Sequence, residues 1–100
     1  MIPSDPAKLN DDGLQAFANG KPSIAEKLLT KAYQELPEEF GILVNLGLAL
    51  MQQSKITKAE HCYQIAVNST EQRVRRSAAK NLGFLYLWIG NYQEGWYWHG

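Results

Sequence analysis

The chain has 100 residues, 45% of them hydrophobic, which is enough for one compact domain and too few for two. Ten basic residues balance ten acidic ones, so no overall charge attracts the chain to nucleic acid, to an anionic membrane or to an acidic substrate. Any binding must therefore come from a local surface of a single domain.

Apolar residues recur at spacings of three and four along the chain, which is typical of helices rather than strands. The predicted helices span residues 6–19, 22–36, 39–53, 56–69, 72–89 and 91–99. Asp5 and Pro6 fit the N-cap and first position of the first helix, and Pro22 starts the second helix in a similar way. Gly20 and Gly90 suit the left-handed conformation that ends a helix, so we expect stops at both glycines.

One pattern of residues occurs three times along the chain. Gly13, Gly47 and Gly83 begin the three copies, at separations of 34 and then 36 residues. Equivalent positions downstream are Ala16, Ala25, Leu29 and Ala32 in the first copy, Leu50, Ala59, Tyr63 and Ala66 in the second, and Tyr86, Gly95 and His99 in the third. The small residues let two antiparallel helices cross closely, and stacking of successive pairs supplies the core.

These residues resemble the tetratricopeptide repeat family, whose pattern runs Trp-x-x-Leu-Gly-x-x-Tyr, then Ala, Phe and Pro. The second copy matches best, at Leu43, Leu46, Gly47, Leu50, Ala59, Tyr63 and Ala66. The first copy has Asp12 where an apolar residue is usual, and the third has Ala79 at the aromatic position. The resemblance implies one all-α domain over residues 1–100, a right-handed superhelical stack of antiparallel helix pairs. Its repeats would cover about 6–39, 40–75 and 76–100, the last incomplete, giving an α-solenoid of about two and a half repeats.

In this family the first helix of each pair lines a concave groove, so the resemblance implies a protein–protein interaction module that binds a segment of a partner polypeptide. The implied groove contacts are Asn45, Leu48, Met51, Gln52, Lys80, Asn81, Phe84 and Trp88. Such a groove would be apolar, with the Asn45 and Asn81 amides able to bond a peptide backbone. The alternative is that Leu14, Leu48, Phe84 and Leu87 are ordinary core residues covered by the chain's own neighbours.

Some members of the family bind chaperones through a clamp for two carboxylates, built from lysine, arginine and asparagine. Only Asn45 of that clamp is present here. We therefore expect no chaperone carboxylate clamp and no strong affinity for acidic chaperone tails.

The last segment, residues 90–100, resembles the Glu-Gly-Trp repeats that precede glycosyltransferase or sulfotransferase regions in larger bacterial proteins. On that alternative, the chain is a structural arm that self-associates or docks a larger enzyme. Trp96, Tyr97 and Trp98 form an aromatic end with no capping helix after it, and such an end is adhesive. Self-association through these three residues is therefore expected if the end stays uncovered.

Catalytic chemistry finds little support in the sequence. His61 and Cys62 are adjacent on a predicted helix, so their side chains diverge instead of facing each other as a base and a nucleophile must. The glycines follow no phosphate-binding fingerprint, and no credible metal site is present. We expect no enzyme activity and no cofactor.

A basic cluster at Arg73, Arg75 and Arg76 could contact RNA, as a third and weaker alternative. A solvated helix face explains it better, because no aromatic residues are interleaved and the net charge is zero. The single cysteine cannot form an internal disulfide, and the sequence shows neither a secretion signal nor an apolar run that could span a bilayer. A cytoplasmic location without a membrane partner is the resulting expectation.

Overall fold

The structure is a computed structural model that describes the backbone of residues 5–99 and the side chains of residues 5–90. Over this range the chain is all-α, with five helices and no strand. The helices are α1 (Pro6–Ala18), α2 (Pro22–Glu35), α3 (Phe40–Gln52), α4 (Ile56–Ala66) and α5 (Gln72–His99). In this range no helix is both long and apolar enough to cross a membrane.

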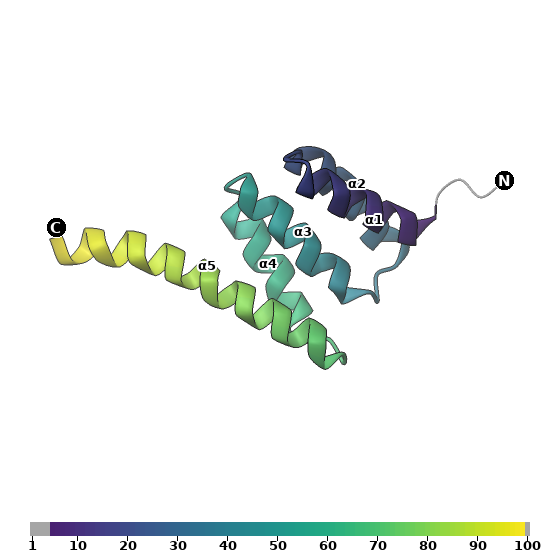
Figure 1. Ribbon diagram of the computed structural model, residues 1–100. Coiled ribbons are helices and arrows are strands. Elements are labelled where there is room, and N and C mark those ends of the chain that lie inside the picture. Colours follow the sequence, from purple (N-terminus) through teal and green to yellow (C-terminus); the bar gives the residue numbers. More distant parts are fainter. Residues whose placement is uncertain (1–4, 100) are drawn as a thin grey trace.

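The helices pack in chain order, each against the next. α1 pairs with α2 and α3 pairs with α4, while α2 also lies against α3 and α4 against α5 (Figure 1). α3 contacts both α1 and α5, so the three odd-numbered helices are neighbours on one side of the molecule. The result is elongated, with extents of 60 × 30 × 17 Å. Figure 1 shows the C-terminal half of α5, in yellow, projecting beyond the other helices.

The two helix pairs are closed by turns of the same geometry. After α1, Gly20 has φ +74°, and the Lys21 amide donates to the Ala16 carbonyl at 2.9 Å. After α3, Ser54 has φ +60°, and the Lys55 amide donates to the Leu50 carbonyl at 2.9 Å. The predicted left-handed stop at Gly20 is thus confirmed. Ser54 lies 34 residues later, at the equivalent place, although it lacks the freedom of glycine at positive φ.

The first helix begins as its sequence predicts. The Asp5 carboxylate accepts a hydrogen bond from the Ala7 amide at 3.1 Å, and Pro6 follows in the first turn. α2 also starts at a proline, Pro22, although no side chain caps it. Proline fits both places because the first helical residue has no intrahelical partner for its amide.

The core lies between the members of each pair and between successive pairs. α3 is its centre and has seven buried residues. At Gly13 an added Cβ would lie 2.6 Å from Leu29 Cγ, and at Gly47 it would lie 2.6 Å from the Tyr63 ring carbon Cζ. Both glycines are therefore places where the second helix of a pair fills the space of a missing side chain, as the repeat pattern predicts.

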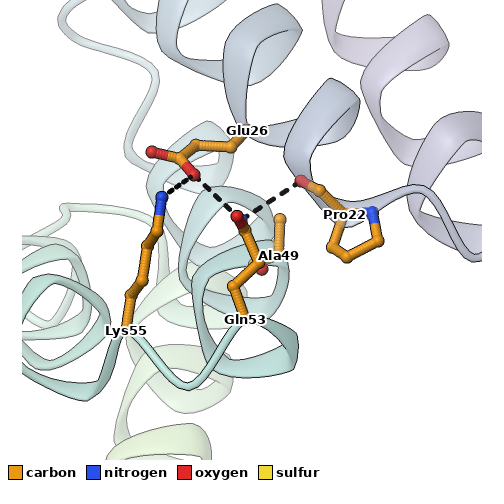
Figure 2. A network of polar contacts seen from close by, with 5 residues as sticks. All are labelled: Pro22, Glu26, Ala49, Gln53 and Lys55. Carbon is orange, nitrogen blue, oxygen red and sulfur yellow. Dashed lines mark hydrogen bonds and ion pairs between the residues drawn. The ribbon is translucent and has the colours of Figure 1, made fainter.

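A polar network ties the first pair to the second (Figure 2). The Glu26 carboxylate on α2 accepts hydrogen bonds from Lys55 Nζ at 2.9 Å and Gln53 Nε2 at 2.8 Å. Gln53 Nε2 also lies 3.1 Å from the Ala49 carbonyl and 3.4 Å from the Pro22 carbonyl. Since an amide nitrogen has two hydrogens, the longer Pro22 contact is the weakest of the three. The network joins α2 to the turn between α3 and α4.

The predicted break at Gly90 is wrong. α5 continues from Gln72 through Gly90 to His99, so one 28-residue helix replaces the two predicted at 72–89 and 91–99. Glycine accepts both the helical and the left-handed conformation, at a cost of roughly 0.5–1 kcal/mol relative to alanine inside a helix. In the described part of the chain no later helix packs back onto α5, so continuation keeps the backbone hydrogen bonds of the helix against this small cost.

Candidate binding groove

A hollow of about 350 Å³ opens on the side of the molecule formed by the odd-numbered helices. It lies where α3 and α5 begin, with α1 beside them. Its lining residues are Asn10, Glu39, Gly41, Ile42, Val44, Asn45, Glu71, Arg73, Val74 and Ser77. Three segments far apart in the sequence therefore form one concave surface, which only the stacking of the pairs brings together.

The amide of Asn45 is positioned by α1. Asn45 Nδ2 donates a hydrogen bond to Asn10 Oδ1 at 3.2 Å, across the α1–α3 contact, and both residues are half-buried. This bond uses one of the two amide hydrogens of Asn45, whose side chain also lines the hollow. A partly buried amide with one fixed bond can thus pair with a peptide N–H and C=O without first being ordered.

α5 continues the hollow with a strip of exposed side chains. Arg73 and Ser77 line the hollow, and Phe84 follows at helical spacing on the same side of α5. Lys80 Nζ lies 6.0 Å from the centre of the Phe84 ring, at the outer limit of a cation–π contact. Phe84 is 59% exposed and Trp88 is 54% exposed. The surface is therefore polar at the start of α5 and aromatic toward its middle.

Asn45 is the one predicted groove residue that lines the hollow. On α3, Leu48 and Met51 are half-buried and Gln52 is exposed. On α5, Asn81 is half-buried, while the remaining predicted residues, Lys80, Phe84 and Trp88, are exposed. The exposed fractions of Phe84 and Leu87, 59% and 62%, do not fit the alternative in which these two residues belong to the core. The aromatic end at Trp96, Tyr97 and Trp98 lies outside the described side chains.

Sequence reasoning missed the charged residues of the hollow. Glu39 and Glu71 directly precede α3 and α5, and Arg73 lies in the first turn of α5. Their place in the sequence could have predicted this, because in a stack of equivalent pairs the loops that precede α3 and α5 lie at the same end. Two carboxylates and one guanidinium therefore surround the polar end of the hollow.

The three arginines near the start of α5 have different surroundings. Arg75 Nη1 donates to the carbonyls of Ser69 and Thr70, both at 3.0 Å, and so holds the loop between α4 and α5. Arg73 lines the hollow, and Arg76 is exposed. RNA contact through these arginines stays a prediction, although one of them is engaged by its own backbone.

A second hollow, of about 510 Å³, lies between α2 and α4 on the other side of the molecule. Its lining residues are Glu26, Thr30, Leu46, Leu50, Thr57, Lys58, His61 and Cys62. Burial and the negative charge of Glu26 raise the pKa of the Cys62 thiol to about 11, so the thiol is protonated at neutral pH and a poor nucleophile. Among the described residues no group of three potential metal ligands occurs.

Comparison with known proteins does not add to this picture. No family model matches the chain, and neither do any curated protein or solved structure.

Proposed function

We propose that this chain is a tetratricopeptide-type interaction domain, without catalytic activity, that binds a segment of another polypeptide along α1, α3 and α5. The observation that supports this most directly is the 350 Å³ hollow that continues into the exposed strip of α5. A concave surface with an apolar floor and a few fixed polar groups is the usual form of a ligand site. The length of α5 beside it suits an extended or helical segment.

The floor of the hollow contributes affinity through apolar contact. Ile42, Val44 and Val74 line it and are 5%, 7% and 9% exposed, so an apolar side chain of the partner would cover the small apolar patches that they leave open. Phe84, at 59% exposed, offers a second apolar contact farther along α5. A partner with two apolar anchors, separated by the distance from the hollow to Phe84, uses both.

The polar groups that line the hollow set the orientation of the bound segment. The Asn45 amide, held by Asn10, can pair with the partner's backbone, and Ser77 adds a hydroxyl on the facing helix. Glu39, Glu71 and Arg73 place charges of both signs at the same end. That mixture gives no concentrated positive potential, so it does not favour a partner that ends in several carboxylates.

The test is selection of peptides from a random displayed library, followed by calorimetric titration of the enriched sequences. A double variant, Asn45→Ala with Ser77→Leu, removes the amide and fills the hollow from α5. We expect the dissociation constant to rise at least about tenfold, because a lost buried hydrogen bond and a filled contact each cost about 1 kcal/mol or more.

The matched control is Gln34→Ala, which removes an exposed amide from α2, outside the groove. It should leave the affinity unchanged, and circular dichroism should show equal helicity for all variants. Peptides that bind the double variant as well as the parent chain would remove the groove from consideration. Failure to enrich any peptide would contradict the proposed function itself.

A further inference from the structure

α5 has two faces with different surroundings. Val74, Ala78 and Leu85 are buried in the contact with the α3–α4 pair. On the opposite face the exposed residues are Ala79, Gly83 and Leu87, which we call the open face. Leu87 is 62% exposed, whereas Tyr86 lies at the edge of this face, where its hydroxyl accepts a hydrogen bond from Gln64 Nε2 of α4 at 3.3 Å. An apolar strip of this kind on one helix is unusual unless another helix covers it.

The two closed pairs show what covers the equivalent face. Gly13 is filled by Leu29, and Gly47 is filled by Tyr63, in each case a residue 16 positions later on the second helix of the pair. A small residue, Ala25 or Ala59, precedes the filling residue by four positions and is fully buried. At Gly83, by contrast, an added Cβ would meet nothing within 4 Å.

The sequence itself contains a segment with the matching pattern. Gly95 and His99 stand 12 and 16 residues after Gly83, at the places that Ala59 and Tyr63 hold after Gly47. In the structure, however, Gly83 and this segment belong to one continuous helix. They are separated by about 18–24 Å along its axis, at 1.5 Å per residue, so the segment cannot cover Gly83 of the same helix.

We propose that a second copy of this chain covers the open face, with residues 91–99 of each molecule lying over Gly83 of the other. The two α5 helices run antiparallel, and each supplies the segment that the other lacks. The contact is isologous, so both open faces are covered at once and the assembly closes as a dimer.

The repeat register places the two-fold axis at a glycine. In the α1–α2 pair, the sequence midpoint between Gly13 and its two covering residues is Gly20. In the α3–α4 pair, the midpoint between Gly47 and its covering residues is Ser54. Both midpoints are turn residues with positive φ. The same arithmetic for Gly83 with Gly95 and His99 gives Gly90. An added Cβ at Gly90 would meet nothing within 4 Å in the single chain, so the helix accepts alanine at this position.

Two glycine substitutions should change the dimer in opposite directions. Gly83→Leu places a side chain where the partner's helix would lie, in both copies, so the dimer dissociation constant should rise about a hundredfold or more. Gly90→Ala favours the continuous helix over a turn with positive φ, so it should strengthen the dimer severalfold. Sedimentation equilibrium over a concentration series measures both effects. Gln15→Leu, an exposed leucine added on α1, is the matched control.

Cross-linking separates exchange between chains from folding back within one chain. Lys80→Cys and His99→Cys are combined in a Cys62→Ala background and treated with a short reagent that joins two thiols. In an antiparallel pair with its axis at Gly90, residue 80 of one copy lies close to residue 99 of the other. The cross-linked product should therefore be a covalent dimer, as mass spectrometry would show.

Three results would overturn the proposal. A chain that stays monomeric at high concentration has no second copy on its open face. A cross-link formed within single chains means that the chain's own segment folds back at Gly90. A dimer that tolerates Gly83→Leu uses another surface. Circular dichroism must confirm unchanged helicity in Gly83→Leu, which the open space around Gly83 allows, and Gly90→Ala provides the independent variant.

Discussion

Gly47 and Gly83 hold the same position in the repeat pattern but have opposite surroundings in the structure. The ring of Tyr63 fills the space beside Gly47, whereas nothing lies within 4 Å of an added Cβ at Gly83. The closed pairs α1–α2 and α3–α4 therefore depend on glycine for packing, and α5 does not in its extended form. A repeated residue can thus mark a contact that one copy makes within the chain and another copy leaves open.

The largest effect should come from removing a residue that fills one of these glycine contacts. Leu29 is fully buried and lies against Gly13, so Leu29→Ala leaves a cavity between α1 and α2. We expect a loss of about 2–5 kcal/mol in the free energy of unfolding, the range for buried leucines. Urea denaturation followed by circular dichroism measures it. Leu87→Ala, at an exposed leucine of α5, should change stability by less than about 0.5 kcal/mol in the monomer.

The next largest loss of stability should come from Gly47→Ala. Its Cβ would lie 2.6 Å from the Tyr63 ring carbon Cζ, and a buried ring between two helices has little room to move. We expect a net loss of about 1–3 kcal/mol from overpacking, in spite of alanine's better helix propensity. The same denaturation experiment tests it, and an unchanged or higher midpoint would show that α3 and α4 can separate without cost.

Gly83→Ala tests the contrast between the two glycines, because the same chemical change should raise the free energy of unfolding instead of lowering it. With open space around Gly83, the added methyl group meets no neighbour, and the helix gains about 0.5–1 kcal/mol. The measurement belongs at a protein concentration where sedimentation shows a monomer, so that the effect on self-association is excluded. A clear loss of stability in that monomer would mean that a helix already packs on this face.

The sequence was sufficient where a residue restricts its own backbone. Pro6 and Pro22 fix the starts of α1 and α2, and Asp5 caps the first of them, so these boundaries followed from local chemistry. Gly90 misled the prediction because glycine permits two conformations, and tertiary contact decides between them. Ser54 has no local preference for positive φ, so only the geometry of the turn explains it.

The residues that line the groove were also predictable only in part. Asn45 could be assigned from its place on the helix face that the repeat pattern directs inward, and it does line the hollow. Glu39, Glu71 and Arg73 could not, because they lie at helix starts whose proximity depends on how the pairs stack. The resemblance to the repeat family therefore implied one residue that lines the hollow, and the charged end required the three-dimensional arrangement.

The smallest effect concerns the network that joins the two pairs. The hydrogen bond from Lys55 lowers the pKa of Glu26 below its ordinary value of 4.5, aided by the Gln53 amide and opposed by partial burial. A carboxyl group with a lowered pKa in the folded state stabilises the fold above pH 4.5, and this contribution disappears as the pH falls through the lowered pKa.

Because the Lys55 side chain is 41% exposed, solvent screens the pair, and about 0.5 kcal/mol is expected. Glu26→Gln should therefore lower the free energy of unfolding by that amount at pH 7, and its difference from the parent chain should shrink as the pH falls below 4.5. Asp11→Asn removes the same charge from an exposed site on α1 and serves as the control. A difference between Glu26→Gln and the parent chain that stays constant from pH 7 to pH 3 would show that the carboxylate's charge does not connect α2 to the second pair.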